Sequence, residues 1–426
     1  MTVDFGGAQF DGTHISPNVQ IAGSNGNGEY DEIDVFMTSA NPSFSIAGWS
    51  FSNWEGIVAI HGTGQADTMT GSSDCQALFF GGAGADHMTA GSAGGGFEYL
   101  HPGDIVAGET IDGADIHSSG LDILGQGAFD FRPVSMANIG VVNFQKGNAV
   151  AKFDAAQFAS AGLYGAAAYG PNATIEIDAA HHLDLSSFIY DLSWNKTDIL
   201  KMIGTGQNDV LTGTFENDRI DGRGGDDTMR GGKGADTYIV NSVRDIVDER
   251  HGNGVDLVES AVNFSLAGSR TFGRVENLKL TGHDTLSAEG NDYNNIITGN
   301  DADNLLTGAG GKGRFVFDTK PGASNLDEIT DFTAGSDKIG ISKAIFQVKE
   351  VQGGTLVSVP LAINRNTFYV AAGATSAHDA NDRFIYDTTS GALYFDKDGK
   401  GHAAAVEIAL LDGAPGLASG DFVLVA

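Results

Sequence analysis

Four aspartates recur at a strict nine-residue spacing in the middle of the chain. Each is the sixth residue of a nonapeptide that begins with glycine, and an apolar residue stands two positions later. The four units follow one another without a gap over residues 204–239 as GTGQNDVLT, GTFENDRID, GRGGDDTMR and GGKGADTYI. Calcium prefers carboxylate and backbone carbonyl oxygens, and a glycine-rich turn exposes its carbonyls. The spacing therefore predicts calcium sites formed by Asp209, Asp218, Asp227 and Asp236 with the turn glycines Gly204, Gly206, Gly213, Gly222, Gly224, Gly231 and Gly234.

The length of the repeat predicts how these aspartates lie relative to one another. Six residues form a tight turn, and the remaining three form a short strand whose middle side chain points inward. Two nonapeptides complete one coil, so equivalent positions stack every 18 residues. We therefore expect Asp209 to lie over Asp227, and Asp218 over Asp236. Stacked carboxylates repel one another without a cation, so calcium binding and folding should be coupled.

A weaker block of the same kind occurs near the N-terminus. GTGQADTMT (62–70) and GGAGADHMT (81–89) place Asp67 and Asp86 at the sixth position. A degenerate unit around Cys75 separates them, so the two aspartates are 19 residues apart, one coil plus one inserted residue. We predict a second calcium block here, and the alternative is a plain β-helix with acidic turns.

A third stretch, residues 290–316, keeps the nine-residue period but loses the acid. Asn295, Asn304 and Gly313 stand where aspartate belongs. Without a formal negative charge this stretch is predicted to bind calcium weakly or only to stack on its neighbours.

The elements that position these turns are short strands. Alternating apolar runs bounded by Gly, Asn and Asp are typical of strands, and helical periodicity is confined to two short segments. The predicted fold is all-β: a parallel β-roll or β-helix solenoid with calcium-binding nonapeptide turns and a β-rich C-terminal cap. The predicted strands include Leu121–Leu124, Phe129–Phe131, Val141–Phe144 and Ala149–Phe153, and the helix candidates are Phe153–Ala161 and Asp379–Arg383.

Changes in repeat character divide the chain into four predicted parts. These are a strand-rich unit with the small calcium block (1–90), a β-rich spacer (91–203), the main β-roll with its degenerate continuation (204–318) and a β-rich cap (319–426).

Composition limits the classes of partner. The chain has 55 acidic and 24 basic residues, a formal charge of −31, which repels nucleic acid and anionic lipid surfaces. Hydrophobic residues make up 41% of the sequence, which still indicates a folded chain. Its excess negative charge then needs a counter-ion. Cys75 is the only cysteine, so no intrachain disulfide forms. No 18-residue apolar run predicts a membrane span, and the start of the sequence lacks the basic and apolar regions of a cleavable signal.

Residues 204–239 resemble the hemolysin-type calcium-binding repeats of repeats-in-toxin (RTX) proteins, whose consensus is GGxGxDxUx. Residues 236–282, which end in VENLKLTG, are similar to a linking module of such proteins. The tail, residues 382–426, resembles the uncleaved C-terminal signal of type I secretion substrates, in which an acidic residue precedes apolar ones, here Asp421 before FVLV. The resemblance implies export through a type I secretion apparatus and an extracellular protein that folds where calcium is plentiful.

Motifs of the enzymes found in such proteins do not occur in the sequence. There is no HExxH for a zinc protease and no GxSxG for a lipase. His181, His182 and Asp184 offer metal-ligating groups, but a solvated loop is the preferred interpretation. Two hypotheses therefore remain. The favoured one is a non-catalytic binding or surface protein that engages extracellular polysaccharide or a host surface. The alternative is a polysaccharide lyase or epimerase on a β-helix face. The scarcity of lysine and arginine in residues 1–140, where only Arg132 occurs, disfavours this alternative.

Overall fold

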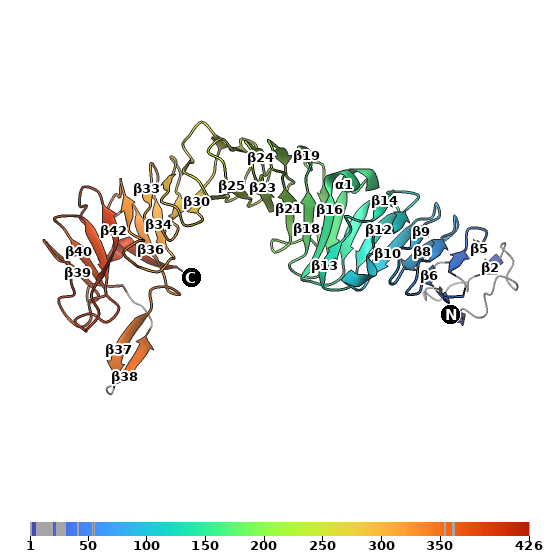
Figure 1. Ribbon diagram of the computed structural model, residues 1–426, viewed down its shortest axis with the longest axis horizontal. Coiled ribbons are helices and arrows are strands. Elements are labelled where there is room, and N and C mark those ends of the chain that lie inside the picture. Colours follow the sequence, from blue (N-terminus) through green and yellow to red (C-terminus); the bar gives the residue numbers. More distant parts are fainter. Residues whose placement is uncertain are drawn as a thin grey trace. The chain divides into compact units, whose positions relative to one another are not determined.

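The computed structural model describes residues 2–5, 20–22, 31–40, 42–52, 54, 56–352, 355–359 and 363–425. The chain forms two compact units (Figure 1). The N-terminal unit contains Met1–Thr205 and Thr212–Arg219, and the C-terminal unit contains Gly206–Leu211 and Ile220–Ala426. The predicted four-part division stays a prediction. The boundary segment carries the short strands β22 (Val210–Thr212) and β23 (Asp218–Asp221).

Parallel sheets built from one strand per coil form the N-terminal unit (Figure 1). The largest has the order β1 (Thr2–Phe5), β3 (Glu32–Phe36), β6 (Ile57–His61), β8 (Gln76–Phe80), β10 (Gly95–Tyr99), β12 (Ser119–Ile123), β15 (Val141–Phe144), β17 (Gly165–Ala168) and β20 (Ile189–Tyr190). A second has the order β14 (Ser135–Ala137), β11 (Thr110–Asp112), β9 (His87–Thr89), β7 (Thr68–Thr70) and β4 (Ser43–Ser45). A third row contains β13 (Gly127–Asp130), β16 (Ala149–Asp154), β18 (Thr174–Asp178) and β21 (Ile199–Ile203). Strand β2 (Gln20–Ala22) pairs with β5 (Ser50–Ser52), and β19 (His182–Asp184) follows β18 in the chain.

The C-terminal unit continues the same architecture and then changes to mixed strand pairing. One row contains β25 (Thr237–Val240), β27 (Leu257–Ser260), β30 (Asn277–Leu280), β32 (Ile296–Thr298), β34 (Arg314–Phe317), β36 (Lys338–Ser342) and β43 (Phe422–Val425). A second contains β24 (Thr228–Arg230), β26 (Ile246–Glu249) and β29 (Thr271–Gly273). The last contains β28 (Phe264–Ser265), β31 (Ser287–Glu289), β33 (Leu305–Thr307), β35 (Asp327–Ile329), β42 (Val406–Leu411), β41 (Ala392–Phe395), β40 (Phe384–Asp387) and β39 (Phe368–Ala371), where β40–β41 and β41–β42 are antiparallel. Strands β37 (Val348–Gln352) and β38 (Thr355–Val359) form a hairpin.

The predicted all-β solenoid is therefore confirmed, and its cause is the alternation of side chains along each strand. In β16 every second residue is buried, and the same alternation continues in β18, which pairs with it in parallel register. Identical inward positions of successive coils then stack, as Phe79 does on Phe97 with ring centroids 5.1 Å apart. Both rings are fully buried, so successive coils share one core at this point of the N-terminal unit.

One of the two predicted helices is present. Helix α1 (Ala155–Ala161) begins after Asp154, whose carboxylate accepts the N–H of Gln157, and it ends at Gly162 in the left-handed conformation. The prediction of a helix at Asp379–Arg383 is wrong, since this segment is a turn. There the Asp382 carboxylate accepts two backbone N–H groups, those of His378 and Asp379, and this turn competes with helix formation. Among the described residues, no helix is long and apolar enough to cross a membrane.

The stacked core gives a first prediction. Phe97→Ala removes a fully buried ring that stacks on Phe79 and should lower the free energy of unfolding by about 3–5 kcal/mol. Urea unfolding followed by circular dichroism in saturating calcium measures this change. Tyr169→Ala, at a side chain that is 62% exposed, is the control and should change stability little. Equal effects of the two substitutions would contradict the stacked core.

Candidate calcium sites

The turns that contain three glycines adopt one conformation. The second and fourth residues of these nonapeptides have positive φ, a region that L-residues with a side chain rarely enter. The first glycine is needed for a different reason, because a Cβ at Gly222 or Gly231 would collide with the carboxylate of the aspartate in its own turn. The positive-φ residues are Gly82 and Gly84 in the N-terminal block and Arg223, Gly225, Gly232 and Gly234 in the main block.

The turn aspartates of successive coils lie on one another in a ladder. The backbone N–H of Asp209 donates to Asp227 Oδ1 at 2.8 Å, and the N–H of Asp227 donates to Asp245 Oδ1 at 2.9 Å. The predicted stacking of Asp209 and Asp227 at the 18-residue spacing is therefore present. All three aspartates are buried, with exposed fractions of 1% or less. Their role as calcium ligands, which geometry alone does not test, stays a prediction.

The N-terminal block repeats this arrangement in spite of its inserted residue. The N–H of Asp67 donates to Asp86 Oδ1 at 2.9 Å, and both carboxylates are buried. The degenerate unit between them places Cys75 in the interior, where burial raises the pKa of its thiol to about 12. The extra residue is absorbed in the loop, so the ladder keeps its register.

The ladder leaves carboxylate oxygens without hydrogen-bond donors. Asp86 Oδ2 and Asp227 Oδ2 are buried and accept no hydrogen bond from any residue that the structure describes. No lysine or arginine of the described ranges pairs with either carboxylate. Burial raises the pKa of each of these aspartates to about 7, and neighbouring aspartates contribute to the increase. A divalent cation would supply the missing charge and bind the unsatisfied oxygens, so these residues fit calcium.

In two nonapeptides that begin with Gly-Thr, the threonine donates to the aspartate of its own turn, although Asp67 Oδ1 is still buried without a donor among the described residues. The N–H of Thr63 donates to Asp67 Oδ2 at 2.5 Å, and its hydroxyl donates to the same oxygen at 2.9 Å. The N–H of Thr214 likewise donates to Asp218 Oδ2 at 2.6 Å. The sequence predicted equivalent repeats, whereas the structure contains two kinds. The aspartates of the Gly-Gly and Gly-Arg turns therefore have the greater need of a cation.

Three acidic residues of the candidate sites were not predicted. Asp245 lies one coil after Asp227, in the unit VNSVRDIVD, which keeps the period but contains no glycine. The N–H of Asp236 donates to Asp256 Oδ1 at 2.9 Å, so the ladder continues in the linking segment with a coil of 20 residues. Glu249, at the end of β26, completes a buried cluster with Asp236 and Asp256 in which carboxylate oxygens lie within 4.8 Å of one another. Burial raises the pKa of Glu249 to about 8 and that of Asp256 to about 6.

In the degenerate stretch, asparagine amides take the place of a cation. Asn295 Oδ1 accepts the N–H of Asn291, and Asn295 Nδ2 donates to the carbonyl of Glu276 at 3.0 Å. In the next nonapeptide, Asn304 Oδ1 accepts the N–H of Asn300, and Asn304 Nδ2 donates to Asn300 Oδ1. An amide offers a donor and an acceptor together, so it satisfies the turn without a formal charge. The N–H of Gly313 donates to the Asp337 carboxylate, which continues the ladder beyond this stretch.

The roles of several other residues stay predictions. Asp218 and Asp236 belong to different compact units, so their stacking stays a prediction. Among the described residues, His181, His182 and Asp184 do not form a metal-binding cluster; the one that contains histidine consists of His378, Asp379 and Asp382. Calcium ligation by the carbonyls of the predicted turn glycines also stays a prediction; these are Gly204, Gly206, Gly213, Gly222, Gly224, Gly231 and Gly234.

Comparison with known families agrees with this geometry. The profile of the RTX calcium-binding nonapeptide repeat matches residues 203–238 and 281–313 in four copies. The chain is an RTX-type repeat protein. Its RTX repeats bind Ca²⁺, the cation that the buried ladder requires. Among curated proteins, none matches the chain. The second matched segment includes the asparagine turns, so the RTX repeats of this protein occur in an acidic form and an amide form.

The ladder predicts unequal effects of two neighbouring substitutions. Asp227→Asn removes a buried negative charge with an unsatisfied oxygen and should weaken calcium affinity about tenfold, because ligand charge tunes affinity. Asp226→Asn removes the same charge from a partly exposed side chain that pairs with Arg244, and it should have little effect. Calcium titration followed by circular dichroism compares the two variants, and a larger effect of Asp226→Asn would refute the assignment.

The raised pKa values predict that the stability of the metal-free protein falls as the pH rises, whereas its calcium affinity rises with pH. In metal-free protein, the pKa of Asp227 is about 7, above its ordinary value, so its contribution to stability is complete below pH of about 4 and is lost as the pH rises through 7. Calcium competes with the proton, so apparent calcium affinity should fall as the pH decreases from 8 to 6. Thermal unfolding with and without calcium at several pH values measures both trends. Asp227→Asn should flatten them, and pH-independent affinity in the wild-type protein would contradict the account.

Proposed function

We propose that the protein is exported by a type I secretion apparatus, folds outside the cell on binding calcium, and acts there as a non-catalytic binding protein. The observation that carries this proposal is the buried ladder of carboxylates with unsatisfied oxygens, at Asp86 and Asp227. Such a stack is unfavourable without a divalent cation, so the chain stays incompletely folded where calcium is scarce. An unfolded chain suits passage through a transporter, and extracellular calcium then drives folding.

The position of the tail supports the same order of events. In the folded protein, strand β43 pairs in parallel with β36, and Asp421 Oδ1 accepts the N–H of Gly335 at 3.0 Å. Asp421 and Phe422 are buried and Leu424 is exposed, so a receptor cannot reach the first two of these residues once the last coil has formed. Recognition of this signal must therefore precede folding, and low calcium inside the cell keeps the tail accessible.

Export and folding can be separated by two double variants in a host that carries a type I transporter. Asp421→Lys with Phe422→Asp alters the tail and should leave the protein inside the cells. Asp209→Asn with Asp227→Asn alters the ladder and should be exported, but it should remain sensitive to protease in calcium-containing medium. Immunoblots of cells and medium, with limited proteolysis of the medium fraction, give both results. Normal export of the tail variant would overturn the proposed route, and calcium-independent protease resistance of the wild-type protein would overturn the proposed folding step.

A further inference from the structure

The largest sheet of the N-terminal unit has a depression whose floor is made of glycine. Gly96 of β10 pairs in register with Gly120 of β12, and their neighbours in the same row are Leu78 on one side and Val141 on the other. Two adjacent strands thus carry no side chain at this level, which leaves a cleft of about 280 Å³. The depression is two strands wide, and because neighbouring strands lie about 4.8 Å apart, it has room for a single six-membered sugar ring.

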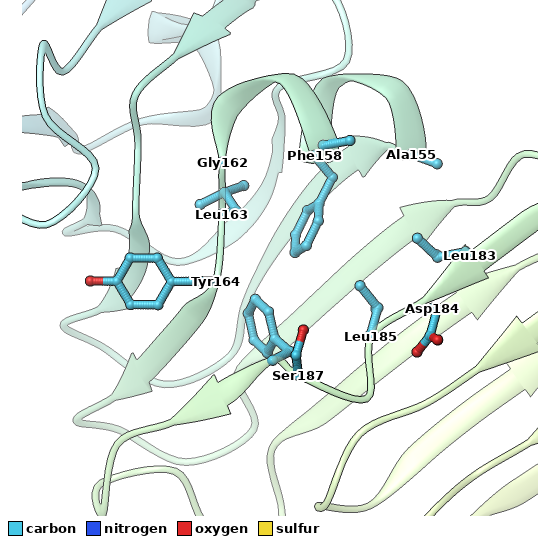
Figure 2. Close-up of a pocket in the computed structure, with 11 residues that line it drawn as sticks. Ala155, Phe158, Gly162, Leu163, Tyr164, Leu183, Asp184, Leu185 and Ser187 are labelled. Carbon is cyan, nitrogen blue, oxygen red and sulfur yellow. The ribbon is translucent and has the colours of Figure 1, made fainter.

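Two rings and several polar groups form the wall of this cleft. His117 lies in the turn before β12 and Tyr164 lies in the segment before β17, with ring centroids 5.8 Å apart. Tyr164 also borders an apolar pocket beside α1, and its hydroxyl points away from Phe158 and Leu185 (Figure 2). Gln76 and Ser118 add further hydrogen-bonding groups to the lining.

A pair of carboxylates borders the floor one row further along the strands. Glu98 pairs in register with Asp122, and both side chains converge over Gly96: a Cβ at that glycine would lie 2.9 Å from Glu98 Oε1 and 3.1 Å from Asp122 Oδ2. Asn143 Nδ2 donates to the other Asp122 oxygen at 3.1 Å and holds that carboxylate in place. No lysine or arginine is among the residues that line the cleft. Burial and the charge of Asp122 raise the pKa of Glu98 to about 8, so Glu98 is largely protonated at pH 7 in the free protein, and a nearby ammonium group would favour its ionised form.

The row of the carboxylates continues into an aromatic ladder. Phe80, His61 and Phe36 occupy the equivalent outward positions of β8, β6 and β3, and their rings stack with centroids 4.5 Å and 4.4 Å apart. A polymer lying across the strands would meet one new side chain at each strand, about every 4.8 Å. This repeat is comparable to the length of one sugar ring in a linear chain.

Taken together, a ring-sized depression, aromatic walls and convergent hydrogen-bonding groups suit a sugar, whose ring has an apolar face and a polar edge. Paired carboxylates without a cation repel phosphate and uronate groups and attract an ammonium group. We propose that this cleft binds a linear glycan that carries free amino groups, with a sugar ring against Tyr164 and His117 and its ammonium group over Glu98 and Asp122. The inference rests on the proposed binding role and is independent of the export route.

The test uses the full-length protein in saturating calcium. Titration calorimetry with a soluble glucosamine oligomer should show binding, an N-acetylglucosamine oligomer should bind at least about tenfold more weakly, and a uronate oligomer should not bind. Glu98→Gln and Asp122→Asn should each weaken binding of the glucosamine oligomer about tenfold. Asp178→Asn is the matched control, because Asp178 lies on a different sheet and its partner Arg132 keeps its pair with Asp130.

A second variant separates binding from folding. The backbone of Gly96 lies outside the left-handed region, and the nearest atoms to a Cβ there belong to flexible side chains. Gly96→Ala should therefore fold normally while filling the space between the two carboxylates, and it should abolish binding.

Several results would overturn the proposal. These are a calcium-folded wild-type protein that does not bind the glucosamine oligomer, equal affinity for the N-acetylated oligomer, or unchanged binding in the Glu98→Gln and Gly96→Ala variants. Shortened oligomers after incubation would instead contradict the non-catalytic role and leave the glycan assignment supported. Failure of export in the earlier experiment bears on neither result.

Discussion

The whole structure depends on the burial of carboxylates on one another along the edge of the coil. Several turn aspartates accept the backbone N–H of the aspartate one coil earlier, as Asp227 does from Asp209 and Asp86 does from Asp67. This hydrogen bond fixes the register of the coils, but it brings negative charges together in a site from which water is excluded. Hydrogen bonds alone do not offset that charge, because oxygens of Asp86 and Asp227 have no donor among the described residues. A cation bound at these oxygens would therefore add to the stability of the solenoid.

The turns limit this uncompensated carboxylate charge in three different ways along the chain. Turns with three glycines leave unsatisfied oxygens for calcium. In two turns that begin with Gly-Thr, the threonine N–H and hydroxyl donate to the aspartate carboxylate, and the degenerate turns replace the acid with asparagine. The amide of Asn295 donates to the same kind of carbonyl that would otherwise face a cation. Coils of the amide kind bury no carboxylate at this position, so we expect them to depend less on metal than coils of the first kind. Calcium dependence would then differ from turn to turn along the solenoid.

The period of the sequence was sufficient to predict the solenoid and the pairing of Asp209 with Asp227, because a nine-residue repeat allows one way to stack equivalent positions. It was not sufficient for Asp245 or Glu249. Asp245 follows a turn without glycine, and Glu249 reaches its cluster only because the coils of the linking segment are longer. The predicted helix at Asp379–Arg383 failed for a local reason, since the Asp382 side chain competes for backbone N–H groups and periodicity does not register that competition. The four predicted parts and the glycine ligands stay predictions.

The cleft of the N-terminal unit and its pair of carboxylates could not be predicted from the sequence. Gly96 and Gly120 are 24 residues apart in a region without a regular repeat, so nothing in the sequence indicates that they are neighbours. Only the register of β10 and β12 places the two glycines side by side and thereby places Glu98 beside Asp122. The same principle that stacks the turn aspartates, one equivalent position per coil, thus also stacks the outward side chains into rows. On the calcium edge such a row buries charge that a metal ion must neutralise. On the face of the sheet the carboxylates of the row are half-buried, so a ligand of the opposite sign could compensate their charge there.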